Sequence, residues 1–510
     1  MFRVRSLVLV AWFVLIGAAA QEQGETTLSG LQQRLLAHVS QPRFAGALWG
    51  VKVVSLDTGA TLFEHNAEKL LSPASNSKLY TVALGLDRLG GDYRIKTSLY
   101  ASARPSPEDN GALKGNLIVY GRGDPTINTH VRSNSVSEVL EPLAAALSKA
   151  GVKRITGDLI GDESFFRGPP FGAGWAWDDL ENSYGAEISA LTINDNVAAL
   201  FVKPNPQPGG PCELRLVPGS CVVLSNRTET LKEGNRSISC YRPLGKNVVY
   251  VTGHVAVGEQ EYRDEIPVPN PAGLFISLFK QVLDKAGIKV EGKVRTLNWL
   301  DRPMAASLCD NLIELGSVAS LPINDIAREI LKPSQNLYAD LLLAHVGEQA
   351  RDSEKTGEQT SEELGIRELN RFLAQIGIAS EDVVFEEGSG LSRNNLTTAR
   401  ATAALLEYMS HHKCAEAFRQ ALPIAGVDGT LRNRMKGTAA AGNVRAKTGT
   451  LRWATSLSGY VTSAAGEHFA FSVMLNRYHN PNGIRSGRED VDAIPVMLAE
   501  FHGRSATEKR

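Results

Sequence analysis

Residues 71–81 read Leu71-Ser72-Pro73-Ala74-Ser75-Asn76-Ser77-Lys78-Leu79-Tyr80-Thr81, and this stretch decides the fold that the sequence predicts. Pro73 favours an extended approach, and the apolar residues after Lys78 predict a buried helix. Positions i and i+3 share one face of a helix, so the hydroxyl of Ser75 and the amine of Lys78 would meet over the same cleft. Such a pair places a nucleophile beside its own base, as covalent catalysis requires.

The S-x-x-K spacing has little specificity by itself, because it occurs twice more, at Ser277/Lys280 and Ser410/Lys413. Ser277 lies inside an amphipathic run and Ser410 lies at the end of another, so we interpret both copies as incidental. The copy at Ser75 differs because two further motifs follow it along the chain.

These two motifs are Ser334-Gln335-Asn336 and Lys447-Thr448-Gly449. The first lies between two predicted helices, and the second opens a series of predicted strands. A second K-T-G at 355–357 falls in an acidic stretch and a second S-x-N at 392–394 falls in a turn, so the context favours the first pair. The order S-x-x-K, S-x-N, K-T-G is typical of class A β-lactamases and penicillin-binding proteins.

Longer phrases narrow this resemblance. They are Pro73-Ala74-Ser75, Gly123-Asp124-Pro125, the G-D-x-S-x-F run at 161–166, the tryptophan-containing run at 174–179 and Gly388-Ser389-Gly390-Leu391-Ser392-Arg393. With these phrases, roughly residues 30–503 resemble the class C low-molecular-weight penicillin-binding proteins, the D-alanyl-D-alanine carboxypeptidases/endopeptidases of the S13 peptidase type. The middle motif is S-Q-N here, and this family varies its central residue.

The pattern of elements indicates an α+β fold. A helix at 31–39 and a hairpin at 47–63 precede Ser75, and a helix at 398–409, strands at 444–450, 454–461 and 469–475 and a helix at 491–501 close the chain. Strands at both ends with helices between them predict one domain that an insertion splits. The polar stretch 351–363 is expected to be an exposed segment.

The resemblance implies a penicillin-binding-protein/β-lactamase-like transpeptidase domain, an antiparallel sheet flanked by helices, formed by residues 30–92 and 305–503. Residues 93–304 would be a large, mostly β insertion, because short β-like runs alternate there with Gly/Pro-rich turns. We expect two subdomains within it, the second at about 205–290.

The N-terminus has the pattern of a secretory signal peptide over residues 1–20. Arg3 and Arg5 precede a short apolar run, and Gly17-Ala18-Ala19-Ala20 supplies small residues for cleavage. The alternative, an uncleaved membrane anchor, needs a longer apolar run. We therefore expect an exported, periplasmic protein of the bacterial cell envelope. No later run reaches spanning length, although peripheral membrane contact stays compatible with the sequence.

The composition of the 510 residues is that of a globular protein, with 43% hydrophobic and 21% charged residues. The formal net charge of −1 gives no electrostatic basis for a nucleic-acid partner. Five cysteines are present, and export makes a disulfide plausible within the group Cys212, Cys221 and Cys240, most simply Cys212–Cys221. No cysteine has zinc-type spacing with histidine, so we expect neither a metal site nor a cofactor.

The resemblance also implies a serine acyl-enzyme mechanism. Ser75 would attack the carbonyl of a D-Ala–D-Xaa bond after Lys78 accepts its proton, and burial together with Lys447 would lower the pKa of that amine. Ser334 would carry the proton to the leaving amine. Asn336 would hold the substrate amide and orient Lys78.

The K-T-G strand would bind the rest of the scissile dipeptide. Lys447 and the hydroxyls of Thr448 and Thr450 would hold the terminal carboxylate, and the N–H groups of Ser75 and Thr450 would form an oxyanion hole. Gly449 would allow the substrate to approach the strand closely.

In the resembling family, an aspartate and a Leu/Arg pair approach the side chain of the residue before D-Ala. The matching residues are Asp162, Leu391 and Arg393, and an Asp with an Arg suits a zwitterionic diaminopimelate end. The alternative is that Asp162 and Arg393 are turn and ion-pair residues.

The sequence thus predicts an exported serine-type D-Ala-D-Ala carboxypeptidase and DD-endopeptidase, whose partners are peptidoglycan stem peptides and β-lactams. Penicillins would acylate Ser75. The alternatives are a non-turnover β-lactam sensor or peptidoglycan-binding scaffold, and a β-lactamase or esterase on the same fold.

Overall fold

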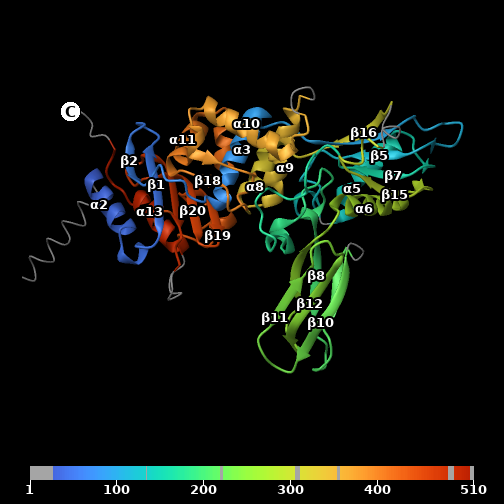
Figure 1. The fold of residues 1–510 in the computed structure, drawn as a ribbon, viewed down its shortest axis with the longest axis horizontal. Coiled ribbons are helices and arrows are strands. Elements are labelled where there is room, and N and C mark those ends of the chain that lie inside the picture. Colours follow the sequence, from blue (N-terminus) through green and yellow to red (C-terminus); the bar gives the residue numbers. More distant parts are fainter. Residues whose placement is uncertain are drawn as a thin grey trace, which may run out of the picture. The chain divides into compact units, whose positions relative to one another are not determined.

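The structure, a computed structural model, describes residues 27–133, 135–218, 222–304, 311–352, 357–479 and 487–505 (Figure 1). The chain forms two compact units. The first unit contains Met1–Gly91, Ala327–Gln335 and Glu368–Arg510, and the second contains Asp92–Ile326 and Asn336–Arg367. The predicted signal peptide, residues 1–20, lies outside the described residues.

A five-stranded antiparallel sheet forms the centre of the first unit, with the strand order β19-β20-β21-β1-β2. The strands are β1 (Leu48–Ser55), β2 (Thr61–His65), β19 (Arg445–Leu451), β20 (Ala454–Thr462) and β21 (His468–Asn476). Strands from both ends of the chain therefore share one sheet, which confirms the predicted α+β fold with a split sheet.

Helices cover both faces of this sheet, because its strands bury alternate residues on opposite sides. Phe471 and Val473 of β21 pack in the same core as α2 (Leu28–Val39) and α13 (Gly487–Ala499). Met474, on the other face, packs against Ala399 of α11 (Ala399–His411). The other elements of this unit are α3 (Ser77–Arg88), α12 (Ala415–Ala421), β17 (Val383–Val384) and β18 (Leu396–Thr397).

The second unit is built around a mixed sheet with the order β15-β7-β5-β3-β16. Its strands are β3 (Lys96–Ala101), β5 (Leu117–Tyr120), β7 (Leu159–Asp162), β15 (Val294–Leu297) and β16 (Ile313–Ala319). The neighbours β5, β7 and β15 run parallel, so their carboxyl ends lie at one edge of the sheet.

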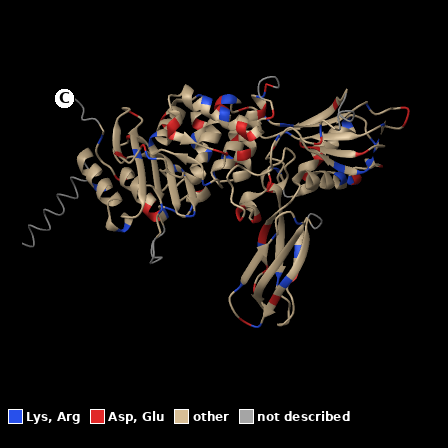
Figure 2. Ribbon diagram, viewed as in Figure 1, with Lys and Arg blue, Asp and Glu red and all other residues tan. Residues whose placement is uncertain are grey.

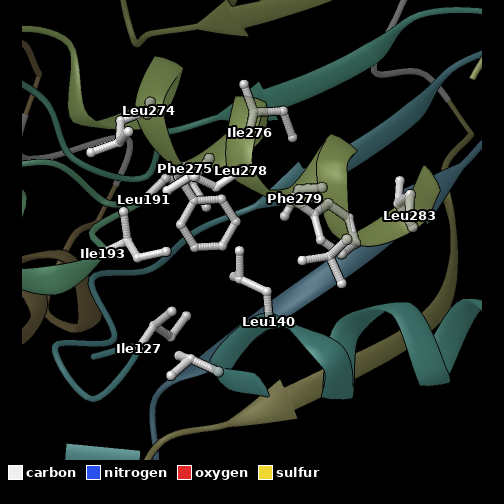
Figure 3. Packing of buried hydrophobic residues seen from close by; sticks show 14 of the residues in the cluster. Ile127, Leu140, Leu191, Ile193, Leu274, Phe275, Ile276, Leu278, Phe279 and Leu283 are labelled. Carbon is white, nitrogen blue, oxygen red and sulfur yellow. The ribbon is translucent and has the colours of Figure 1, made fainter. Parts of the chain in front are cut away.

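Two helices pack on this sheet, so the insertion is less purely β than the sequence indicated. They are α5 (Val136–Lys149) and α6 (Pro271–Lys285). Figure 3 shows Phe275 and Phe279 of α6 in the same buried cluster as Leu140 of α5. α6 is the amphipathic run that contains Ser277, and its apolar face belongs to this cluster.

The rest of the second unit consists of three smaller sheets and short helices. Their elements are β4 (Ala112–Leu113), β6 (Arg154–Ile155), β8 (Val197–Lys203), β9 (Glu213–Val217), β10 (Val223–Leu231), β11 (Ser237–Tyr241), β12 (Val248–Ala256), β13 (Tyr262–Pro267), β14 (Lys289–Val290) and α4 (Thr129–Arg132). The two compact units do not coincide with the predicted domains at 30–92, 93–304 and 305–503, and those bounds stay a prediction.

Along the chain, the S-x-N motif lies between α8 (Ile323–Leu331) and α9 (Asn336–Gln349), and α10 (Ser361–Gln375) follows. The last begins inside the segment 351–363, which the sequence predicted to be exposed. Gly357, Glu358 and Glu363 are exposed, residues 353–356 lie outside the described residues, and the prediction is wrong for Ser361. Ser361 is 2% exposed and starts α10, and its hydroxyl donates to Glu348 over 2.5 Å. Glu362 and Glu363 lie in the first turn of this helix, where carboxylates are favourable.

The predicted Cys212–Cys221 disulfide is wrong, because Cys212 is a free, buried thiol. Its Sγ lies 3.5 Å from the Thr230 hydroxyl and 3.6 Å from the Glu229 carbonyl oxygen. Cys240 is also a free thiol, while Cys221 lies outside the described residues.

Figure 2 shows basic and acidic residues interspersed along both units, as the net charge of −1 indicates. Every helix within the described ranges is too short or too polar to cross a membrane. In the same ranges, His, Cys, Asp and Glu do not gather in threes with metal-binding geometry.

Candidate active site

Ser75 lies in a short 3-10 turn, Ala74–Asn76, that leads directly into α3. The sequence placed Ser75 in the helix itself. The turn arises because Ala74 adopts a left-handed conformation with φ 47°, which few residues other than glycine tolerate. The turn is held by the Ser456 hydroxyl, which donates to the Pro73 carbonyl over 2.6 Å, and by Asn76 Nδ2, which donates to Ser458 Oγ over 2.7 Å.

Lys78 lies in the first turn of α3 and is fully buried, whereas Ser75 is partly exposed. Lys78 Nζ donates to Ser75 Oγ over 3.0 Å and to the carbonyl oxygen of Ser389 over 2.6 Å. The other two S-x-x-K copies differ. Lys280 pairs with Asp284 over 2.8 Å, and the Ser277 hydroxyl donates back to its own helix. The Ser410 hydroxyl donates to the Glu407 carbonyl oxygen over 2.7 Å.

The loop that supplies the Ser389 carbonyl is organised by Glu387, whose side chain is fully buried. Its carboxylate accepts hydrogen bonds from the backbone N–H groups of Ser389 (2.9 Å) and Gly390 (2.7 Å) and from Asn395 Nδ2 (2.7 Å). Sequence reasoning missed Glu387, because a lone acid before a Gly-Ser-Gly turn carries no motif.

Lys447 and Ser334 form the second hydroxyl–amine pair. Lys447 is fully buried in β19, the edge strand of the sheet, and its Nζ donates to Ser334 Oγ and to the Thr448 carbonyl oxygen, over 2.8 Å each. Ser334 lies between α8 and α9 with a left-handed φ of 69°. Such a conformation is costly for serine and is common where a side chain is held for function.

The pKa of Lys447 is held well below its ordinary value. Burial is the largest cause, and repulsion from Lys78 and then from Arg434 adds to it. The sequence predicted such a lowering for Lys78. The mutual repulsion places both amines in one site of the first unit.

β19 lies directly against the turn that carries Ser75. A Cβ atom added to Gly449 would overlap the Pro73 carbonyl oxygen and would lie 3.1 Å from the backbone nitrogen of Ser75. Glycine is therefore required for this close approach. Thr448 is buried and its hydroxyl donates to Thr430 over 2.8 Å, while Thr450 is exposed.

Asn336 begins α9 and belongs to the second unit. It is 8% exposed, and its Nδ2 donates to the Tyr184 carbonyl oxygen over 2.9 Å. Tyr184 lies in a tight double turn, Asp179–Glu181 and Ser183–Gly185, of the insertion. Sequence reasoning missed this contact because a backbone carbonyl has no residue signature.

The three residues expected to recognise the peptide stem are in different settings. Asp162 ends β7 in the second unit, where it is fully buried, pairs with Arg302 and accepts the Ser164 N–H over 2.9 Å. Leu391 is buried and Arg393 is exposed, and both belong to the first unit. The ion pair of Asp162 is what the structural alternative predicts, and the proposed role in recognition stays a prediction.

The first unit thus brings together Ser75, Lys78, Ser334 and Lys447 with the K-T-G strand. A partly exposed hydroxyl beside one buried amine, and a second hydroxyl beside another, can exchange protons without a carboxylate or a histidine. On an α+β fold with this antiparallel sheet, the arrangement defines the class of penicillin-binding proteins and β-lactamases.

Comparison with known proteins identifies the family. The model of the D-Ala-D-Ala carboxypeptidase 3 (S13) family matches residues 31–499, and the chain belongs to this family. The chain is 32% identical to a D-alanyl-D-alanine carboxypeptidase of Actinomadura sp. (strain R39), an alignment covering 97% of this chain and 89% of the relative. It is 28% identical to the D-alanyl-D-alanine carboxypeptidase DacB of Haemophilus influenzae, covering 85% and 86%.

A solved structure agrees. The crystal structure of penicillin binding protein 4 (dacB) from Haemophilus influenzae matches with a TM-score of 0.74 and 26% identity, over 90% of this chain and 97% of that one. The family resemblance that the motifs indicated is therefore confirmed, and so is the fold class.

Proposed function

We propose that this protein is an exported serine DD-peptidase of peptidoglycan. It hydrolyses terminal D-Ala-D-Ala as a carboxypeptidase, and it also cuts D-Ala–diaminopimelate cross-links as an endopeptidase. The family supports the carboxypeptidase activity. The observation that carries the mechanism is the 3.0 Å hydrogen bond between Lys78 Nζ and Ser75 Oγ in a site with a second buried lysine.

In the proposed acylation, neutral Lys78 takes the proton of Ser75 as Oγ attacks the carbonyl carbon of the penultimate D-Ala. The oxyanion is held by the N–H groups of Ser75 and Thr450, with about 3 kcal/mol for each donor. The C–N bond then breaks, and Ser334 passes a proton from the lysine pair to the leaving nitrogen. In deacylation, water loses a proton to Lys78, attacks the ester and regenerates the Ser75 hydroxyl.

The terminal carboxylate is bound by Lys447 with the hydroxyls of Thr448 and Thr450, on the strand where Gly449 permits close approach. The low pKa of Lys447 fits this role, because an arriving carboxylate favours the charged amine and offsets the repulsion from Lys78. Asn336, held by the Tyr184 carbonyl, presents its remaining amide groups to the substrate amide and to Lys78.

For the peptide stem, we assign Arg393 to the carboxylate and Asp162 to the ammonium of a diaminopimelate-type side chain, with Leu391 against its methylenes. Binding of that ammonium replaces Arg302 as the partner of Asp162. Leu391 and Arg393 lie in the proposed split catalytic domain, 30–92 and 305–503, and Asp162 lies in the proposed insertion, 93–304.

The same site takes β-lactams, because their strained amide mimics D-Ala-D-Ala and acylates Ser75. Export to the periplasm rests on the signal-peptide pattern of residues 1–20. Mature secreted protein starting after Ala20 is the expected result of N-terminal sequencing.

The test is to incubate the protein with fluorescent penicillin, diacetyl-Lys-D-Ala-D-Ala and cross-linked muropeptide dimers, beside Ser75→Ala. The matched control is Ser77→Ala, a buried serine of the same segment whose hydroxyl accepts from Asn395 over 3.3 Å. Labelling and D-Ala release should vanish in Ser75→Ala and persist in Ser77→Ala. Labelling without turnover of any peptide would assign a sensor or scaffold, and rapid release of the label would assign a β-lactamase. Absence of labelling in the unaltered protein would overturn the acyl-enzyme.

A further inference from the structure

The second unit contains a cavity of about 530 Å³ that takes no part in the proposed reaction. All of its lining residues belong to this one unit. They come from the segments after the parallel strands β7 and β15, from the start of α6, from α9 and from the start of α10. The carboxyl ends of parallel strands are a common place for ligands, and the volume is that of a small-molecule site.

Much of the wall is apolar. Phe166, Trp299, Leu300 and Leu343 line it, and the Trp299 indole N–H donates to the Gly168 carbonyl oxygen over 3.1 Å. That hydrogen bond satisfies the polar end of the indole, so its ring can serve as a fixed apolar wall.

Two carboxylates interrupt this apolar wall. Glu163 follows β7, and its Oε2 accepts the Ser189 hydroxyl over 2.5 Å. Glu187 accepts the backbone N–H of Asn270, just before α6, at its own Oε2 over 3.0 Å. Among the described residues, neither carboxylate has a Lys, Arg or His within ion-pair distance, and Oε1 of each accepts no hydrogen bond.

The electrostatic surroundings of these carboxylates favour a positively charged ligand. Burial raises the pKa of both groups, and Glu187 raises that of Glu163 further by like-charge repulsion. Arg242 acts on Glu187 only at longer range. Four of the lining residues are acidic (Glu163, Glu187, Asp340 and Glu362) and one, the exposed Arg167, is basic. Glu163 and Glu187 are each half-buried, and partial burial of a charge costs free energy that a bound cation offsets.

We propose that this cavity is a second ligand site, which binds an organic cation: an ammonium group on an apolar body. The ammonium lies against Oε1 of Glu163 and Glu187, where its three N–H donors complete both carboxylates. The apolar body lies against Trp299 and Phe166. An anion meets four carboxylates here, and a neutral ligand leaves the two Oε1 atoms without donors.

The experiment compares three probes with one ring: cyclohexylmethylamine, cyclohexylmethanol and cyclohexanecarboxylate. Each is titrated into the full chain by calorimetry at neutral pH, before and after Ser75 is blocked with benzylpenicillin, and into Ser75→Ala. The amine should bind at least about tenfold more tightly than the alcohol, because the ammonium forms a charge-assisted contact that the hydroxyl does not form. The carboxylate should not bind. Blocking Ser75 should leave the affinity for the amine unchanged.

Three variants assign the site. Glu163→Gln should weaken binding of the amine by about tenfold and leave that of the alcohol unchanged. Glu229→Gln, an exposed glutamate outside the cavity, is the matched control and should change neither. Leu300→Arg puts a cation on a lining residue that is 62% exposed, so the fold tolerates it, and it should abolish binding of the amine.

Equal affinity for the amine and the alcohol would overturn the proposal. So would full affinity for the amine in Glu163→Gln, competition with benzylpenicillin, or no binding of the amine on the order of 10 mM. Each outcome is independent of whether the chain turns over peptides, because the readout is binding.

Discussion

Each of the two units contains a pair of like ionisable side chains, fully buried lysines in the first and half-buried glutamates in the second, and the two pairs differ in what surrounds them. In the first unit, the amines of Lys78 and Lys447 are fully buried and donate to hydroxyl and carbonyl oxygens of Ser75, Ser389 and Ser334. In the second unit, the carboxylates of Glu163 and Glu187 line an open volume of about 530 Å³. The amines are held by hydrogen bonds to protein atoms, whereas the carboxylates face the cavity.

Ordinary buried charges in the same chain are paired. The buried carboxylates of Asp492 and Asp382 each form a bidentate ion pair, the first with half-buried Arg434 and the second with exposed Arg400. Compensated pairs of this kind are structural. Ionisable side chains without an ion-pair partner need another explanation, and their surroundings distinguish two kinds of function. Amines held against hydroxyls suit proton transfer, and carboxylates facing a cavity suit the binding of a cation.

The strongest test of this difference between the two units is to remove the amine of Lys78. Lys78→Met should lower the rate of acylation by fluorescent penicillin by about 10³- to 10⁴-fold, because Ser75 loses its base. The free energy of unfolding should not fall, since a fully buried amine that repels Lys447 is replaced by an apolar side chain of similar size. The pKa of Lys447 should rise because this repulsion is gone. In its proposed role Lys447 binds the substrate carboxylate as a charged amine, so the alkaline limb of the pH–rate profile should move to higher pH.

Lys280→Met is the matched control, because it changes the same motif position in a copy where the lysine pairs with Asp284. It should leave acylation unchanged. A fall of less than tenfold in Lys78→Met would show that this lysine is not the base.

The next largest effect is expected from the strand beside Ser75. In Gly449→Ala, the new methyl group overlaps the Pro73 carbonyl oxygen, so β19 and the turn must separate. This shift would displace the N–H donors of the proposed oxyanion hole, and kcat/KM for D-Ala release should fall about 10²- to 10³-fold. Gly46→Ala, where a methyl group meets no atom within 4 Å, is the control. Unchanged kinetics in both variants would remove Gly449 from the site.

A buried group with complete partners should affect stability instead of binding or chemistry. His345 on α9 is fully buried, with Nε2 at 3.0 Å from the Tyr93 hydroxyl and Nδ1 at 3.0 Å from the Arg122 carbonyl. Burial lowers its pKa to about 4, against 6.5 in the unfolded chain. The unfolded state therefore binds more protons at acid pH, and stability is lost as the pH falls from about 6.5 to about 4.

The expected loss for this histidine is about 2 kcal/mol between pH 7 and pH 5. Urea unfolding at the two pH values measures it, and His345→Gln should flatten the difference by that amount whatever its own stability. An unaltered slope in His345→Gln would show that another group causes the acid sensitivity.

The sequence predicted the motif residues and the sheet because both signals are local or periodic. Ser75 and Lys78 are one turn apart, and the strand β21 is a long, largely apolar run that follows the K-T-G motif closely in the chain. Glu387 was missed because its role is to accept N–H groups of the loop after it, which any acid could do. α5 was missed because the turn-rich sequence around it dominated the pattern.

The contacts of Asn336 and the cavity could not be predicted for a different reason. Tyr184 acts through its carbonyl oxygen, and Glu163 and Glu187 come together through the folding of the irregular segment between β7 and β8, which has no periodic pattern. The Cys212–Cys221 disulfide failed because spacing alone does not say where a thiol points, and that of Cys212 lies against Thr230.

The smallest effect concerns the turn that holds Asn336. A methyl group on Gly185 overlaps the Asp179 carbonyl oxygen, so Gly185→Ala should shift the neighbouring Tyr184 carbonyl away from Asn336 Nδ2. We expect kcat/KM for D-Ala release to fall about tenfold, the equivalent of one hydrogen bond of about 1.4 kcal/mol. Tyr184→Phe keeps the carbonyl and should keep the activity.

A double-mutant cycle separates positioning from general damage. If Gly185 acts through Asn336, then Gly185→Ala should cost nothing further in an Asn336→Ala background. An additive loss would mean that the turn affects the reaction by another route. The second unit would then contribute to catalysis through groups other than Asn336, and the proton chemistry would rest with the lysine pair of the first unit.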